Sequence, residues 1–244
     1  MTTSLCDDSK YTNISENIKT IRQEIAEAAV KSGRNPEDVR LMAVTKTVSV
    51  EYINYAIEHC GIDLIGENKV QEFLSKRDTL KLDGVEKHLI GHLQTNKVRK
   101  ILPEVDMIQS VDSLRLATAI SSEAEKNGIM AQILLEINIG EESSKTGFDK
   151  SAFFESLDAI SKLPFITVKG MMTIPPICDD LSTLEKYFAM MYDYYNEIKD
   201  KNFNNFDFEI LSMGMSGDYK EAVAHGSNLV RVGSAIFGAR IYNK

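Results

Sequence analysis

Eight short apolar runs recur along the chain, and a stretch long enough for a helix separates each run from the next. The runs lie at residues 41–45, 63–67, 87–91, 106–110, 131–138, 166–172, 208–212 and 229–233. Apolar strands that alternate with helices are typical of a parallel sheet covered by helices. Eight such units in 244 residues favour a (β/α)₈ TIM barrel. An open, doubly wound sheet stays an alternative, although no GxGxxG motif follows the first run.

An amphipathic helix is predicted ahead of the first run. Its apolar residues recur at three- and four-residue spacing and comprise Ile14, Ile18, Ile21, Ile25 and Ala29. Gly33 then ends the helix, as a C-terminal glycine does. Because no linker or low-complexity segment interrupts the chain, we expect residues 1–244 to form a single α/β barrel domain with an extra N-terminal helix.

Charge and hydropathy exclude several classes of protein. The net charge of −8 argues against a general nucleic-acid binder, which needs a basic face. No apolar stretch approaches the roughly 18 residues that span a bilayer, and the polar N-terminus does not resemble a signal peptide, so we expect a cytoplasmic protein. Cys6, Cys60 and Cys178 lie far apart, so no metal site is predicted.

Polar residues follow the apolar runs at the carboxyl ends of the predicted strands. In a barrel these ends form the face that carries active sites. The residues concerned are Lys46, Asn68, His92, Asn138, Met172 with Thr173, Ser212, and Arg231 with Gly233. Convergence from seven of the eight strands indicates a functional site at this face.

Lys46 ends the first run, in the sequence "LMAVTKTVSV". A lysine at the inner mouth of a barrel is partly desolvated, which disfavours its charged form and makes its amine a better nucleophile. Such a lysine commonly forms a Schiff base with a carbonyl group. Taken alone, the strand favours an ordinary lysine that reaches solvent from a strand end.

Two glycine- and serine-containing turns predict a phosphate site. One lies in "SMGMSGDYKEAVAHG" (212–226), just before a helical pattern that begins at Asp218, and the other lies in "VRVGSAIFGAR" (230–240). Backbone N–H groups at a helix start bind anions, and serine hydroxyls add donors. The loops after strands seven and eight form the usual phosphate site of this barrel class. A phosphate opposite a Schiff-base lysine describes pyridoxal 5′-phosphate (PLP).

The sequence resembles the YggS/PROSC family of pyridoxal phosphate homeostasis proteins. The resemblance covers nearly the whole chain and rests on "AVTKT", "GENKVQE", "HLIGHLQTNK", "GMMTIP", "LSMGMSGD" and "VRVGSAIFGAR". It implies a fold type III PLP barrel like the N-terminal domain of bacterial alanine racemase.

The same resemblance implies roles for individual residues. Lys46 matches the residue that carries PLP as an aldimine, and Arg231 matches the residue that faces the pyridine nitrogen. The positions that match the surroundings of the phosphate are Ser212, Met213, Gly214, Ser216, Gly233 and Ser234. Asn68, His92 and Met172 match or adjoin positions that line the cofactor pocket, and for His92 we expect a lining role rather than a catalytic one.

We expect a carrier of PLP rather than an enzyme. PLP enzymes that need a strong electron sink usually protonate the ring nitrogen through an acidic partner, whereas an arginine only donates a hydrogen bond. Racemisation needs a second proton-transfer group, and alanine racemases supply a tyrosine from an additional C-terminal domain. The sequence ends at Lys244, shortly after Gly233, so we expect that domain to be lacking. Tyr219, the nearest tyrosine to a motif, is expected to be structural.

The resemblance implies that such a carrier holds PLP, delivers it to apo PLP-dependent enzymes and keeps vitamin B6 and amino-acid pools balanced. We expect a monomer, because the racemase dimer uses the second domain. A minimal fold type III amino-acid racemase stays open as the alternative. An interaction protein whose PLP site is vestigial is disfavoured, because no element of the predicted site is degraded.

Overall fold

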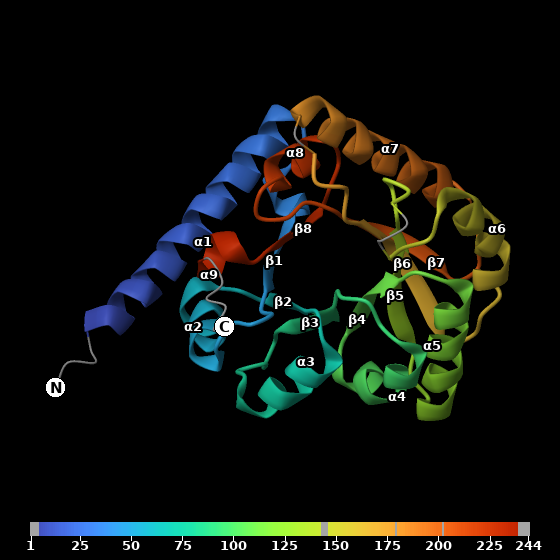
Figure 1. Cartoon of the computed structure of the whole chain (residues 1–244), viewed down its shortest axis with the longest axis horizontal. Helices are drawn as coiled ribbons and strands as arrows, with labels where there is room; N and C mark the ends of the chain where they lie inside the picture. The colour runs from blue at the N-terminus through green and yellow to red at the C-terminus, as the bar shows by residue number, and fades with distance from the viewer. Residues whose placement is uncertain (1–4, 143–145, 179, 202, 239–244) are drawn as a thin grey trace.

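Eight parallel strands close into a barrel in the computed structural model (Figure 1). They pair in chain order, and β8 returns to pair with β1. The strands are β1 (Arg40–Val44), β2 (Leu64–Glu67), β3 (Glu86–Leu89), β4 (Met107–Val111), β5 (Ala131–Ile137), β6 (Ile166–Thr173), β7 (Phe206–Ser212) and β8 (Leu229–Val232). The (β/α)₈ barrel is therefore confirmed, the open sheet is wrong, and all eight strands lie within two residues of the predicted runs.

The structure describes residues 5–142, 146–178, 180–201 and 203–238. Residues 239–240 of the last predicted motif and the side chain of Cys6 lie outside this description. The α-helices are α1 (Leu5–Lys31), α2 (Val50–Cys60), α3 (Val70–Lys76), α4 (Val98–Ile101), α5 (Leu114–Asn127), α6 (Lys150–Ile160), α7 (Leu181–Lys199), α8 (Tyr219–Ala224) and α9 (Ser234–Phe237). Short 3₁₀ helices span Pro36–Asp38, Arg77–Thr79, Thr95–Lys97 and Leu102–Glu104. Among the described helices, none is both long enough and apolar enough to cross a bilayer.

The extra N-terminal helix α1 lies against α2, α8 and α9, the helices that follow β1, β7 and β8 (Figure 1). Its predicted apolar stripe is buried, with exposures of 0 to 4%. Polar contacts add to this packing, because Asn17 Nδ2 donates to the Ile236 carbonyl at 3.0 Å and Arg34 Nη1 donates to the Val223 carbonyl at 2.9 Å. The helix therefore covers the seam between β8 and β1 from outside.

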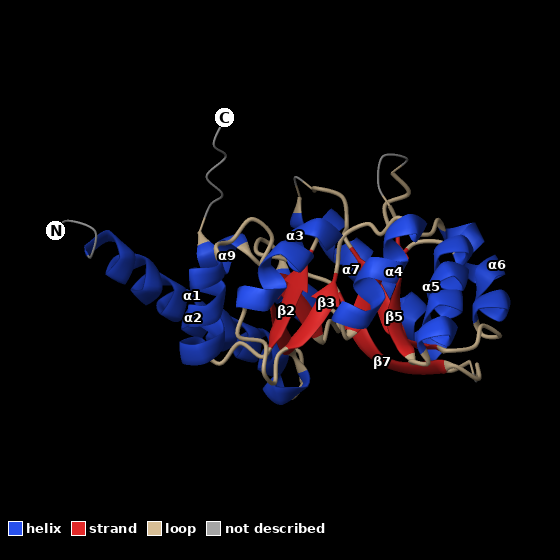
Figure 2. Cartoon of the chain, turned by 90° about the horizontal axis from the view of Figure 1, so that it is seen from below, coloured by secondary structure: helices blue, strands red, loops and turns tan. Residues whose placement is uncertain are grey.

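Helices lie around the outside of the strands (Figure 2). Alternation along each strand sends one set of side chains outward, against the helices, and the other set into the barrel. The inward apolar side chains form two separate clusters. One cluster consists of Met42, Val44, Leu64, Ile90 and Leu229, and the other of Met107, Leu134 and Met172. Buried polar residues occupy the same inward register, including His88, Gln109, Ser212 and Arg231.

Candidate functional site

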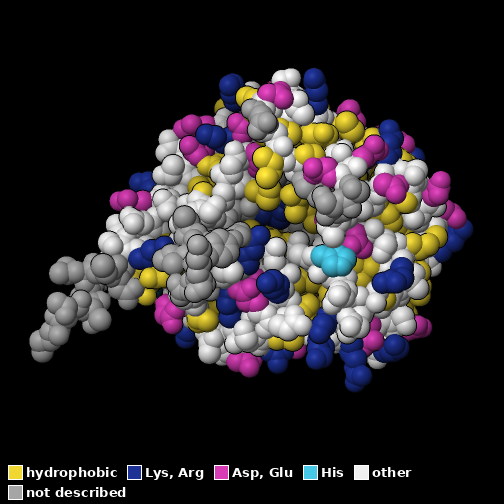
Figure 3. All heavy atoms as spheres, in the orientation of Figure 1, with side chains coloured by type: hydrophobic (Ala, Val, Ile, Leu, Met, Phe, Trp, Pro, Cys, Tyr) yellow, Lys and Arg dark blue, Asp and Glu magenta, His cyan; other side chains and the backbone are white. Residues whose placement is uncertain are grey.

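The predicted polar residues collect where the strands end, at the face shown in Figure 3. Basic side chains lie at the floor of a central hollow on this face, and hydrophobic side chains border part of it (Figure 3). The loops that follow β1, β2, β7 and β8 bring Lys46, Asn68, Ser216 and Ser234 to this end of the barrel.

Lys46 lies two residues beyond the end of β1, in the tight turn that connects β1 to α2, and it is half-buried. The next residue, Thr47, has a φ of 63°. A β-branched residue rarely adopts this left-handed conformation, which costs on the order of 1–3 kcal/mol and persists only where surrounding contacts enforce it. The turn that presents the Lys46 amine is therefore held in a strained conformation.

Side chains of α3 hold both neighbours of Lys46. The Thr47 N–H donates to Glu72 Oε1, and Lys76 Nζ donates to the Thr45 carbonyl at 3.1 Å. Lys76 also pairs with Glu72 at 2.6 Å, which links the two contacts. These hydrogen bonds fix the backbone on each side of Lys46 and so limit the position of the Lys46 Cα, from which the side chain extends.

A buried carboxyl group, Glu67 at the end of β2, completes the support of this turn. Thr45 Oγ1 donates to Glu67 Oε2 at 3.0 Å, and Lys76 Nζ lies 3.6 Å from the same oxygen. Burial raises the pKa of Glu67, while the Asn68 N–H and Lys76 act in the opposite direction. Sequence analysis missed Glu67, although an acidic residue that ends an apolar strand was a visible signal.

The turns after β7 and β8 lie together, as the predicted phosphate site requires. Ser216 Oγ, from the first turn, accepts hydrogen bonds from the N–H groups of Gly233 at 3.1 Å and Ala235 at 3.2 Å, both from the second. The Arg231 N–H donates to the Gly214 carbonyl at 2.9 Å. A serine hydroxyl and the backbone N–H groups that begin α9 therefore converge on one point, which is the donor set a phosphate uses.

Close packing requires glycine in both turns. Gly214 has a φ of 94°, and an added Cβ would lie 2.6 Å from the Cβ of Ala222 on α8. An added Cβ at Gly233 would lie 3.3 Å from the Cβ of Val44 at the end of β1. The turn after β8 therefore lies directly against the strand that leads to Lys46.

Arg231 is the most deeply buried cation of the site, with 3% exposure. Its Nη1 donates to Ser212 Oγ at 2.6 Å, and its Nη2 donates to the Thr173 carbonyl at 2.8 Å. Burial lowers the pKa of Arg231 to about 10, against the opposing charges of Asp218 and Glu136. Since this value is far above neutral pH, Arg231 remains a cation that only donates hydrogen bonds.

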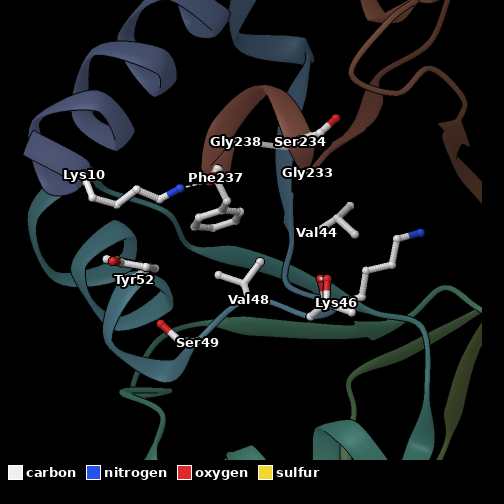
Figure 4. A pocket seen from close by; sticks show the side chains of 11 residues that line it. Lys10, Val44, Lys46, Val48, Ser49, Tyr52, Gly233, Ser234, Phe237 and Gly238 are labelled. Carbon is white, nitrogen blue, oxygen red and sulfur yellow. Dashed lines mark hydrogen bonds between the residues drawn. The ribbon is translucent and has the colours of Figure 1, made fainter. Parts of the chain in front are cut away.

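A cavity of about 230 Å³ lies between the start of α2 and the start of α9. Lys46, Ser49, Tyr52, Gly233 and Ser234 are among its lining residues. In Figure 4 the Lys46 side chain extends away from Val48 and Tyr52, on the side of β1 towards which the Ser234 hydroxyl points. Lys46 and one predicted phosphate turn therefore line the same cavity, with the Lys46 amine pointing away from Val48 and Tyr52.

Other predicted residues have different surroundings. Asn68 is half-buried, and its buried Oδ1 has no hydrogen-bond partner among the described residues, so it has an acceptor to offer a ligand. The His92 side chain is 52% exposed and its Nδ1 lies 2.9 Å from Asp112 Oδ2, while Met172 faces into the barrel. The Met213 side chain is buried in the outer core, which leaves its backbone for a ligand.

Ser212 lies inside the barrel rather than between the two turns. Its hydroxyl contacts Arg231 and Gln109, both within 2.8 Å. Gln109 and its other neighbour, His88, were absent from the predicted site. Each lies beside apolar residues in a predicted strand, "DMIQS" or "KHLIG", and a polar residue at a buried strand position was the signal that could have identified them.

Comparison with known proteins agrees with this geometry. Residues 11–241 match the family described as alanine racemase, N-terminal domain. The curated pyridoxal phosphate homeostasis protein of Aquifex aeolicus is 36% identical over 230 residues, which cover 94% of this chain and 100% of that protein. The protein of the same name from Escherichia coli is 35% identical over 235 residues, covering 95% of this chain and 99% of that protein. The chain belongs to the family of pyridoxal phosphate homeostasis proteins.

Solved structures place this family on the racemase fold. PipY of Synechococcus elongatus, solved with PLP bound, is 32% identical with a TM-score of 0.77, covering 88% of this chain and 100% of that chain. A protein of unknown function from Bifidobacterium adolescentis reaches a TM-score of 0.87 at 36% identity, covering 94% of this chain and 96% of that one. Alanine racemase of Streptomyces coelicolor shares the fold at 18% identity, with a TM-score of 0.69, over 94% of this chain and 59% of that chain.

Proposed function

We propose that this protein binds PLP at the mouth of the barrel and holds it for use elsewhere in the cell, without being an enzyme. The observation that carries the proposal is the shared cavity, which Lys46 and the Gly233–Ser234 turn line together. The names of the homeostasis relatives and the PLP bound in PipY support the same ligand. In this proposal the Lys46 amine is the covalent anchor, and the turns after β7 and β8 hold the phosphate.

The chemistry of the residues fits PLP. A half-buried amine suits an aldehyde, and serine hydroxyls with backbone N–H groups suit a phosphate. The unpartnered Asn68 Oδ1 would provide an acceptor, and Arg231 would provide a donor for the ring nitrogen. When bound, PLP supplies an electron sink for amino-acid chemistry.

The same residues argue against strong catalysis. An arginine that stays charged cannot transfer a proton to the ring nitrogen, so it leaves the electron sink weak. The Tyr219 hydroxyl, which the racemase alternative would need as a second base, instead donates to Glu24 on α1. We therefore expect slow, reversible holding of PLP and transfer to apo PLP-dependent enzymes, with a monomer as the expected state, which light scattering checks.

The first experiment asks whether PLP binds and through which residue. The visible spectrum of the purified protein with added PLP is compared with that of Lys46→Ala, before and after borohydride reduction. We expect an absorption band for the wild type alone, and reduction should fix the mass of the cofactor to the peptide that contains Lys46. A wild type that stays colourless with added PLP would refute the proposal.

A second experiment separates the carrier from the minimal racemase. The PLP-loaded protein is incubated in D₂O with alanine and other amino acids, and deuterium at the α-carbon is followed by NMR. We expect exchange no faster than with free PLP. In parallel, an apo PLP-dependent enzyme should be reactivated faster by the loaded protein than by spontaneous release of PLP. Rapid α-exchange or the absence of faster transfer would contradict the carrier.

A further inference from the structure

A line of buried polar side chains crosses the interior of the barrel from Arg231. The guanidinium donates to Ser212 Oγ at 2.6 Å, and that hydroxyl donates to Gln109 Oε1 at 2.8 Å. Gln109 Nε2 lies 2.7 Å from His88 Nδ1. The four residues come from β8, β7, β4 and β3, and each is at most 3% exposed. They form one connected chain of hydrogen bonds in the core.

The chain continues to the opposite end of the barrel. His88 Nε2 lies 2.6 Å from Glu86 Oε1, and Arg40 Nη2 lies 2.7 Å from Glu86 Oε2. Glu86 begins β3 and Arg40 begins β1, so this end lies at the rim away from Lys46. The two inward apolar clusters, which include Met42 and Met107, lie in the same barrel interior. The polar chain thus connects the two ends of the barrel.

With the Gln109 amide in the orientation seen here, the two ends of the chain fix the direction of each hydrogen bond. Arginine has no hydrogen-bond acceptor, so Ser212 Oγ accepts from Arg231. The hydroxyl then donates its single proton to Gln109 Oε1. The amide nitrogen of Gln109 then faces His88 Nδ1, which must carry no proton. The one ring proton sits on Nε2 and donates to Glu86, whose pKa is lowered to about 2 by this bond first and also by Arg40. His88 is therefore neutral in this arrangement.

This chain orients the guanidinium of Arg231. The group is planar, so bonds from Nη1 to Ser212 and from Nη2 to the Thr173 carbonyl fix both its plane and its direction. The Ser212 hydroxyl accepts from Arg231 because its own proton is donated to Gln109 Oε1. The Gln109 amide is held in turn by its hydrogen bond to His88. The position of Arg231 thus depends on residues that lie deeper in the barrel than the pocket.

We propose that Ser212, Gln109 and His88 are positioning residues that hold Arg231 against the ring nitrogen of PLP and so set how tightly the cofactor is retained. This inference rests on the proposed function. It assigns the retention of PLP partly to side chains on β3 and β4 that lie below the pocket.

The test compares two substitutions at Gln109 in the PLP-loaded protein. Gln109→Met keeps the volume and interrupts the chain. Gln109→Glu keeps an acceptor for Ser212, and its buried carboxyl group, when protonated, donates to His88 Nδ1 as the amide does. The readouts are the position of the visible absorption band and the rate of PLP release, measured with a phosphatase that destroys free PLP.

We expect Gln109→Met to shift the band and to release PLP roughly tenfold faster, because a charge-assisted hydrogen bond loses its support. Gln109→Glu should stay near the wild type in both readouts. The matched control is Ser227→Ala, which removes a buried hydroxyl that contacts the carbonyls of Leu211, Met213 and Leu229 but lies outside the chain. This control should change neither readout.

The outcomes separate this inference from the proposed function. If the wild type does not bind PLP, the proposed function is refuted. If the wild type binds PLP but Gln109→Met behaves like Ser227→Ala, only the positioning role of the hydrogen-bond chain is refuted. If Gln109→Met fails to fold, ¹⁵N NMR of the apo wild type tests the chain directly, with His88→Gln for assignment. A neutral His88 with its proton on Nε2 supports it, and a proton on Nδ1 overturns it.

Discussion

Lys46 and Arg231 are two cationic residues at the same end of the barrel, and the protein holds them in opposite ways. Arg231 is buried in β8 and donates to Ser212 and Thr173 from within the sheet. Lys46 is half-buried in a turn beyond β1, where the contacts shown fix the backbone of its neighbours Thr45 and Thr47. The Arg231 guanidinium is held by its own hydrogen bonds within the sheet, and the backbone on both sides of Lys46 is held by side chains of α3.

This difference suits a site that takes up and releases PLP. The proposed covalent anchor must change its bonding each time the cofactor arrives or leaves, so its side chain needs room to move. Arg231, the proposed partner of the ring nitrogen, only has to donate the same hydrogen bond whenever PLP is bound. Its burial and fixed hydrogen bonds are therefore compatible with its role. The comparison predicts that substitutions at the two positions affect stability and PLP binding in different proportions.

The largest expected effect separates the two cations by stability. Arg231→Leu leaves Ser212 and the Thr173 carbonyl without their donor in the barrel interior, so we expect a loss of about 3–5 kcal/mol in the free energy of unfolding. Lys46→Met should change it by less than about 0.5 kcal/mol, because the position is half-buried. Urea unfolding of the apo proteins measures both. Equal losses would show that the two residues are held alike.

A smaller effect concerns Glu86, at the far end of the buried chain of hydrogen bonds that begins at Arg231. His88 and Arg40 lower the pKa of Glu86 to about 2 from its usual 4.5, so its stabilisation is present above pH 4.5 and is lost as the pH falls towards 2. Because the Glu86 side chain is 29% exposed, we discount this to about 1–2 kcal/mol. Glu86→Gln should lower stability by that amount at neutral pH.

The pH dependence checks the sign of this effect. The difference between the wild type and Glu86→Gln should shrink as unfolding is repeated at pH values between 4.5 and 2. Asp158→Asn is the control, because Asp158 belongs to an exposed pair with Lys162. A difference that stays constant across this range would mean that the Glu86 carboxylate does not support the buried chain.

The smallest effect sharpens the description of the Lys46 turn. Glycine adopts the φ of 63° at Thr47 without strain, and it keeps the N–H that donates to Glu72. We expect Thr47→Gly to raise the free energy of unfolding by between zero and about 1 kcal/mol, since the greater entropy of the unfolded chain offsets part of the relief. Thermal unfolding of the apo protein measures it. A clear loss of stability would show that the Thr47 side chain is needed to form the turn.

Much of the fold followed from local patterns. The apolar runs identified eight strands, and the stripe from Ile14 to Ala29 identified the first helix, because burial on one side leaves a periodic trace in the sequence. The glycine and serine turns within 212–226 and 230–240 predicted one shared phosphate site, which requires the turns to meet, and Ser216 does contact Gly233. The end of the barrel at which these residues gather was also predictable, because the carboxyl ends of parallel strands face the same way.

The tertiary structure alone decided three matters. It decided that the sheet closes, through the pairing of β8 with β1. It decided that α3 supports the Lys46 turn through Glu72 and Lys76. It also decided that Ser212 bonds Gln109, 103 residues away, and so joins Arg231 to His88. Hydrophobic periodicity records which side of an element is buried, but it carries no information on which buried polar groups meet, because their partners come from distant strands brought together only when the barrel closes.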